Sequence, residues 1–198
     1  MEMTAVEIDF EVCDVENGIL QFKGKFKSTE SLQQYPAWED NLETDAWKKT
    51  ERCKTGMIEN IFKQCLVARP DDPDGCTAVF DNPGSDRQTF ALQIYSTTNF
   101  TGGLSVVFTV TYKNEKYYMC CTQDMKIYFK KGECPNRITG DRSEIIFFQK
   151  AFSEGDGCFR FQSALHEKYY LAVSNEDGKS KLILQYSDGL NEREKFDI

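Results

Sequence analysis

Short apolar runs that alternate with polar residues recur along most of the chain. Twelve such runs are bounded by turn-forming residues, and each predicts a strand: near 57–61, 65–68, 77–80, 90–95, 104–112, 116–121, 126–129, 144–150, 158–163, 169–174, 182–185 and 195–198. No segment carries an amphipathic helix of three turns. Twelve short strands, spaced by roughly 12 residues, predict an all-β barrel or sandwich. The sequence shows no obvious internal repeat, so self-similarity does not identify a three-fold arrangement.

The stretch before these runs has a pattern of its own. Residues 6–12 alternate between apolar and acidic side chains, and Asn17-Gly18 signals a hairpin. A two-residue loop would place charged residues opposite apolar ones. A three-residue loop, Glu16 to Gly18, instead places Asp9 opposite Lys25 and gathers the apolar groups on one face. We therefore predict a hairpin with a three-residue loop, whose apolar face packs on the domain that follows.

Charge divides the chain at Asp45. Residues 1–45 hold 11 of the 32 acidic residues and three of the 24 basic ones, which leaves 21 of each sign for residues 46–198. The whole formal charge of −8 therefore precedes Ala46. This asymmetry predicts a removable or regulatory acidic segment, 1–45, in front of a neutral domain, 46–198. The polar, mixed stretch from Thr44 to Glu51 is expected to be the hinge between them.

Composition narrows the classes of function. A neutral domain without a basic stripe does not favour nucleic-acid binding. No signal peptide and no run long enough to cross a membrane precede or interrupt the domain, so we expect a chain made in the cytosol. The eight cysteines include no Cys-x-x-Cys pair, and cytosolic thiols stay reduced. We expect Cys65 and Cys120 in the core, and Cys53 and Cys134 at the surface.

Residues that resemble catalytic groups are better explained by exposed turns. His166 is expected in a hairpin turn with no nucleophile placed beside it by any motif. Asp71-Asp72 lies in a proline-rich turn, where the carboxylates are expected to be solvated. Gly178-Lys179-Ser180 lacks the earlier glycine of a phosphate-binding loop. We therefore expect no enzymatic activity, no cofactor and no metal, and a protein that acts by surface contact.

Leu42-Glu43-Thr44-Asp45-Ala46 matches the pattern that inflammatory caspases accept. Such a protease buries the carboxylate of the aspartate before the cut, and paired guanidinium groups bind it by charge-assisted hydrogen bonds. The pattern also requires an apolar residue three positions before the aspartate and a small residue directly after it. An acidic chain offers such tetrapeptides by chance, so a solvated linker is the alternative. Tyr35-Pro36 upstream and Lys48-Lys49 downstream favour an exposed connector and cleavage between Asp45 and Ala46.

The C-terminal third resembles the interleukin-1 family of cytokines. The resemblance rests on 142–150, on Phe159-Arg160-Phe161-Gln162-Ser163 and on Lys168-Tyr169-Tyr170-Leu171-Ala172. It implies a β-trefoil, in which twelve strands form a six-stranded barrel closed by three hairpins. The residues that match the family signature would then have a structural role, and Phe161, Tyr169 and Leu171 would occupy barrel-core positions. The full set of signature residues is Phe161, Ser163, Tyr169, Tyr170, Leu171 and Ala172.

The resemblance extends to the acidic segment, because 39–45 is similar to the processing site of one family member that lacks a signal peptide. It implies a monomeric pro-inflammatory cytokine precursor that an inflammatory caspase activates and that leaves the cell by an unconventional route. Its expected partners are a pair of receptor chains with immunoglobulin-like ectodomains and a soluble binding protein. The segment 48–68 matches poorly, so no receptor contact is carried over by residue, and the divergence suggests a non-mammalian source.

Two alternatives remain open at this point. One is an intracellular β-trefoil binding module of the lectin or cytoskeletal kind, which would keep its acidic segment permanently. The other is a protease inhibitor on the same fold, with 71–75 as its reactive loop. Limited cleavage after Asp45 would distinguish the precursor hypothesis from the first alternative, because a permanent acidic segment predicts no such cleavage.

Overall fold

The computed structural model describes residues 9–16, 19–25, 46–72, 77–82, 84, 87–98, 102–176 and 178–198. The chain divides into two compact units, Met1–Asn41 and Leu42–Ile198. The regular elements of the described residues are strands, apart from a single 3-10 turn, Glu192–Glu194. No helix in this part of the chain is long and apolar enough to span a membrane. The expectation of an all-β protein is confirmed, and a boundary at residue 45 stays a prediction.

The first unit contains a β-hairpin of β1 (Asp9–Glu16) and β2 (Ile19–Lys25). Asp9 pairs with Lys25 as expected, but the register shifts between Val12 and Asp14, and Glu16 pairs with Ile19. The predicted three-residue loop is therefore wrong, since only two residues connect the strands. A β-bulge at Cys13 supplies the extra residue that the register needs, so the shift lies inside the strand and not in the turn. Asn17 and Gly18 themselves lie outside the described residues.

The second unit holds fourteen strands among its described residues. All twelve runs read from the sequence have a counterpart, and two further strands, β3 and β11, were not predicted. The bounds are β3 Ala46–Gly56, β4 Glu59–Asn60, β5 Cys65–Ala68, β6 Ala78–Asp81, β7 Phe90–Ser96, β8 Leu104–Tyr112, β9 Glu115–Cys121, β10 Ile127–Lys131, β11 Arg137–Thr139, β12 Phe147–Ala151, β13 Phe159–Ser163, β14 Tyr169–Glu176, β15 Lys179–Tyr186 and β16 Phe196–Asp197.

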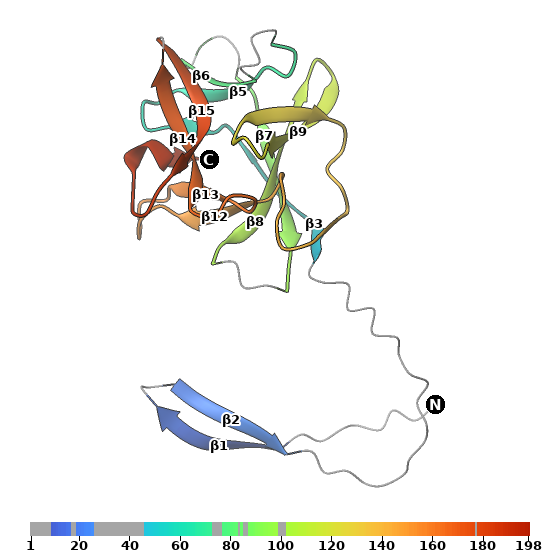
Figure 1. Cartoon of the computed structure of the whole chain (residues 1–198), viewed down its shortest axis with the longest axis vertical. Coiled ribbons are helices and arrows are strands. Elements are labelled where there is room, and N and C mark those ends of the chain that lie inside the picture. Colours follow the sequence, from blue (N-terminus) through green and yellow to red (C-terminus); the bar gives the residue numbers. More distant parts are fainter. Residues whose placement is uncertain are drawn as a thin grey trace, which may run out of the picture. The chain divides into compact units, whose positions relative to one another are not determined.

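These strands form one antiparallel sheet that closes on itself (Figure 1). The path β13-β14-β15-β6-β5-β4-β16 returns to β13, because Phe196 of β16 pairs with Asn60 on one side and with Phe159 on the other. The path continues from β13 through β12, β8, β7 and β3 to β11. In the sequence, β14 and β15 are separated by a two-residue turn, and Figure 1 shows them as a long hairpin.

Closure of the sheet encloses a core of phenylalanine and aliphatic side chains, the barrel core. At its centre the Phe108 ring lies 4.9 Å from that of Phe161 and 5.6 Å from that of Phe147, in edge-on contacts. Edge-on packing is favourable for aromatic rings, because the positive edge of one ring meets the negative face of the next. All three rings are buried, and their contacts join the neighbouring strands β8, β12 and β13 on the core face of the sheet.

A second apolar cluster lies on the other face of the same strands. Side chains alternate along β8, so Val106, Phe108 and Val110 enter the barrel core, while Val107 enters the second cluster. This outer cluster contains Trp47, Tyr95, Val107, Tyr118, Cys120, Cys134, Ile145 and Ile146. Strand β8 is therefore buried on both faces, which explains its almost continuous apolar sequence.

Candidate functional site

The predicted processing segment ends where the second unit begins its sheet. Leu42, Glu43, Thr44 and Asp45 lie outside the described residues, so their recognition role stays a prediction. Ala46 is the first residue of β3. The expected hinge up to Glu51 is therefore wrong from Ala46 onward, because these residues belong to a strand. The sequence of this segment is polar and mixed, but its backbone is held in an extended conformation by pairing with the neighbouring strands β11 and β7.

The first residues of β3 are paired with β11 at one end of the strand path. Ala46 pairs with Thr139, Trp47 with Ile138 and Lys48 with Arg137. The Lys49 N–H then donates a hydrogen bond to the Asn136 carbonyl oxygen at 2.9 Å. The backbone directly after the predicted cleavage position therefore has hydrogen-bond partners along its length.

Trp47 anchors this part of β3 in the outer cluster. Its side chain is only 3% exposed, and its Nε1–H donates a hydrogen bond to Ser105 Oγ at 3.2 Å. Its ring centroid lies 6.5 Å from that of Phe148. A buried indole combines a large apolar area with one satisfied donor, which makes it a strong local anchor. This role was not predicted, and its only local signal is one tryptophan in an otherwise polar run.

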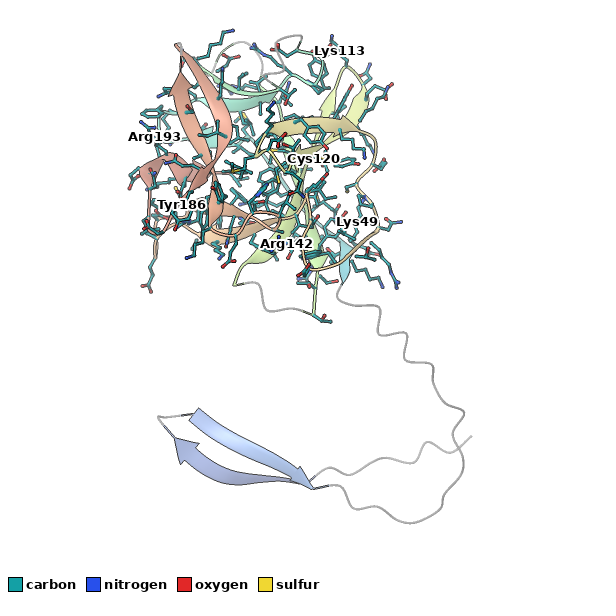
Figure 2. The ribbon with its side chains drawn as sticks, viewed as in Figure 1. Lys49, Lys113, Cys120, Arg142, Tyr186 and Arg193 are labelled. Atoms are coloured by element: carbon teal, nitrogen blue, oxygen red, sulfur yellow. The ribbon has the colours of Figure 1, made fainter. Side chains whose placement is uncertain are left out.

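A bulge interrupts β3 directly after the paired residues. The register with β7 shifts between Lys49 and Cys53, and the Gln93 side chain donates hydrogen bonds to the Thr50 and Arg52 carbonyl oxygens, at 2.7 and 3.0 Å. Thr50 Oγ1 in turn donates to the Ile94 carbonyl oxygen at 2.8 Å. These side-chain bonds replace the missing ladder and fix the bulge in place. In Figure 2, Lys49 marks this side of the domain, at the far end from Lys113.

The signature residues lie together on β13 and β14. Phe161, Leu171 and Ala172 are buried, with Phe161 and Leu171 in the barrel core. Ser163 Oγ is buried and accepts hydrogen bonds from the backbone N–H groups of Leu165 and His166, at 3.1 and 3.2 Å. It therefore caps the turn that follows β13.

The two signature tyrosines lie nearer the surface. Tyr169 is half-buried and packs against the barrel core from its rim. Tyr170 faces a cation, because the Arg160 guanidinium carbon lies 3.6 Å from its ring centroid. His166, beside them, was predicted to be exposed, and this is wrong because its side chain is half-buried. Its Nε2 lies 2.8 Å from the Thr122 carbonyl oxygen. This contact ties two turns together.

Arg160 also forms a buried ion pair that the sequence does not reveal. Its Nη2 lies 2.8 Å from Glu194 Oε2, and Nη1 donates a hydrogen bond to the Gly189 carbonyl oxygen at 2.9 Å. Glu194 is completely buried, and desolvation raises the pKa of its carboxyl, although the Ser187 side chain and Arg160 act in the opposite direction. The pair holds the 3-10 turn of 192–194 against β13.

The cysteines divide by exposure. Cys53 is exposed and Cys65 and Cys120 are buried, as predicted, but Cys134 is also buried, which corrects its predicted place at the surface. The polar neighbours of Cys134 point outward, while its thiol enters the outer cluster. Figure 2 shows Cys120 in the body of the domain; its burial raises the pKa of the thiol to about 11, so it stays neutral. The described residues include no group of three or more side chains suited to a metal ion.

The surface also carries a cavity of about 410 Å³ between the end of β5 and the β8–β9 turn, lined by Arg69, Asp71, Lys113 and neighbouring residues. Lys113 Nζ lies 2.6 Å from Asp71 Oδ2, and this hydrogen bond lowers the pKa of the Asp71 carboxyl. Asp71 therefore stays ionised at neutral pH and is a poor proton donor. Residues 73–75, which complete the alternative reactive loop, lie outside the described residues.

The closed antiparallel sheet and its phenylalanine core define a β-trefoil of the interleukin-1 type. The crystal structure of chicken interleukin-1β matches it with a TM-score of 0.58 and 18% identity, over 76% of this chain and 97% of that one. At this identity the match shows the fold, and it confirms the trefoil expected from the resemblance.

Sequence comparison then identifies the family. The family model "Interleukin-1 / 18" matches residues 82–198, and the chain belongs to this family of cytokines. Interleukin-18 of Gallus gallus is 33% identical over 171 residues, covering 79% of this chain and 84% of the relative. Interleukin-18 of Homo sapiens is 30% identical over 158 residues, covering 78% and 80%. The predicted resemblance is confirmed, including a non-mammalian relative.

Proposed function

We propose that this protein is a pro-inflammatory cytokine precursor that an inflammatory caspase activates by cleaving between Asp45 and Ala46. One observation carries the proposal: the tetrapeptide Leu42 to Asp45 stands immediately before Ala46, the first residue of the first strand of the domain. A cut there would release the acidic segment and leave every strand of the trefoil intact. A cut several residues later would remove Trp47, which the outer cluster buries.

The released domain, residues 46–198, binds a receptor pair with immunoglobulin-like ectodomains and brings their cytoplasmic parts together. By family membership the proposed pair is the α and β chains of the interleukin-18 receptor, and a soluble interleukin-18 binding protein would compete for the domain. The domain acts as a monomer and works by contact, without catalysis. Its precursor is held in the cytosol and the processed form leaves by an unconventional route.

Cleavage would change the charge that the protein presents. Loss of residues 1–45 removes a net charge of −8 and leaves a domain with equal numbers of acidic and basic side chains. The long-range electrostatic steering between the domain and a charged partner would change with it, and so would the association rate. This gives the acidic segment a role in inactivity without requiring a change of fold.

The test is the intact mass of the full chain before and after brief treatment with an inflammatory caspase. We expect one new product that begins at Ala46, and no such product from Asp45→Ala. Surface-immobilised receptor ectodomains should then bind the product at least tenfold more tightly than the precursor. The matched control is Asp124→Ala, in an exposed turn, which should be processed as the wild type is.

Resistance at Asp45, under conditions in which the protease cuts a control substrate, would remove the precursor proposal. The family membership and the trefoil would stand, and an intracellular binding module with a permanent acidic segment would become the better hypothesis. That hypothesis predicts equal partner binding with and without residues 1–45.

A further inference from the structure

The residues directly after the proposed cut are not free to enter a protease. Ala46, Trp47 and Lys48 pair with Thr139, Ile138 and Arg137, and the Lys49 N–H is bonded to the Asn136 carbonyl oxygen. A protease holds its substrate as an extended strand, with backbone hydrogen bonds to the enzyme. The backbone groups on the C-terminal side of the cut are thus already occupied by β11.

From this geometry we infer that the bond after Asp45 is cut only when the first residues of β3 leave β11, and that Trp47 sets how often this happens. The inference rests on the proposed function, since it concerns the rate of that same cleavage. It makes Trp47 a positioning residue for processing, although it contributes nothing to the caspase recognition pattern.

Trp47 carries most of the anchoring. Its side chain is buried, with the indole hydrogen-bonded to Ser105 Oγ and the ring beside Phe148. Lys48 is exposed, and β11 is short, with exposed residues on either side of a half-buried Ile138. Release of these residues therefore costs the burial of one indole, a few backbone hydrogen bonds to β11, and the pairing of Lys48 and Lys49 with Ser96 and Tyr95 of β7.

The bulge limits how far the strand opens. Gln93 holds the carbonyl groups of Thr50 and Arg52, and Thr50 holds that of Ile94. Fraying that begins at Ala46 therefore stops at this clamp, before it reaches the residues paired with the middle of β7. Opening of this kind is local, so its free energy is smaller than that of unfolding the barrel.

When opening and closing are fast relative to cleavage, the cleavage rate follows the population of the open form. The experiment compares kcat/KM for cleavage of the full chain with that of a synthetic peptide of residues 40–50, which has no sheet to leave. We expect the peptide to be cut at least tenfold faster than the folded chain. Trp47→Ala in the full chain should raise its kcat/KM at least fivefold toward the peptide value.

Three controls keep the result specific. Trp47→Ala in the peptide should change its rate less than twofold, because the effect must come from the sheet and not from the protease subsite. Leu182→Ala, in the barrel core on β15, weakens the domain without touching β3 and should change processing less than twofold. Trp47→Phe keeps an aromatic anchor without the Ser105 bond, and should give a smaller increase if Trp47→Ala fails to fold.

The outcomes separate this inference from the function on which it rests. If neither peptide nor full chain is cut after Asp45, the proposed function fails. If both are cut at equal rates, or if Trp47→Ala and Trp47→Phe leave the full-chain rate unchanged, processing stands and strand opening is overturned. An equal acceleration by Leu182→Ala would assign cleavage to global unfolding, which also overturns it.

Discussion

The two apolar clusters of the trefoil share strands but are built from different chemistry. The barrel core consists largely of phenylalanine and aliphatic side chains, whereas the outer cluster contains Trp47, two tyrosines and two cysteines. Barrel-core residues come from strands all around the ring. The outer cluster instead joins β3 to β7, β8 and β9, and it holds the strand that follows the acidic segment. Both clusters therefore stabilise the domain, and the outer one in addition holds its first strand.

The largest expected effect breaks the barrel core. Phe161 is 1% exposed, and its ring lies 4.9 Å from that of Phe108 and 6.1 Å from that of Phe196. Phe161→Ala removes both contacts and leaves a cavity, so the free energy of unfolding should fall by about 3–5 kcal/mol. Urea denaturation measures the change. A loss below about 1 kcal/mol would mean that the barrel repacks around the gap.

An alkaline titration should act on the outer cluster. Burial raises the pKa of Cys120 to about 11 and that of Tyr128, packed beside it, to about 12. Because the folded pKa of Cys120 lies above its ordinary value of 9.0, its stabilising contribution is present below pH 9 and is lost as the pH rises toward 11. The free energy of unfolding of the wild type should fall between pH 8 and pH 10.5, and in Cys120→Ala this fall should be smaller by about 1–2 kcal/mol.

The measurement is urea denaturation at pH 8 and at pH 10.5. Val107→Ala is the matched control, since it lies in the same cluster and carries no titratable group. It should lower the free energy of unfolding equally at both pH values. Parallel curves for wild type and Cys120→Ala would show that the thiol titrates without affecting the cluster.

The smallest effect concerns one hydrogen bond. Tyr95 is 2% exposed, pairs with Lys49 of β3, and donates its hydroxyl hydrogen to the Pro135 carbonyl oxygen. Tyr95→Phe keeps the ring and removes that bond, at a cost of about 1 kcal/mol. Hydrogen exchange should quicken at the amides of 47–49 while those of β13 and β14 stay protected. Uniform acceleration would mean that the two clusters open together.

Strands of the barrel core could be predicted because their own residues alternate. β3 and β11 could not, since each contributes one apolar residue to the outer cluster, Trp47 and Ile138, within otherwise polar sequence. The extended form of β3 comes from its pairing with β7 and β11 and from the burial of Trp47, and that of β11 from its pairing with β3 and the partial burial of Ile138. Cys134 was predicted at the surface for the same reason: its sequence neighbours are polar, but its side chain belongs to the outer cluster, whose other members are distant in the sequence.

The candidate site divides in the same way. The recognition pattern Leu42 to Asp45 is local and can be predicted from the sequence alone. The anchoring of Ala46 to Lys48 depends on β11, about 90 residues later, and no local pattern reports it. In the hairpin, Asp9 and Lys25 were correctly paired by charge, while the bulge at Cys13 had no signal that distinguished it from a longer loop.

Closure of the ring by β16 has a consequence for how the protein is made. Phe196 pairs with Asn60, so the ring joins residues near the two ends of the domain. Pairings between residues this distant along the chain form slowly, because the entropy of closing a long loop is lost before the stabilising contacts form. During synthesis one edge each of β4 and β13 therefore stays unpaired until β16 has left the ribosome. For that interval the chain exposes unpaired strand edges, which raises its risk of pairing with another chain.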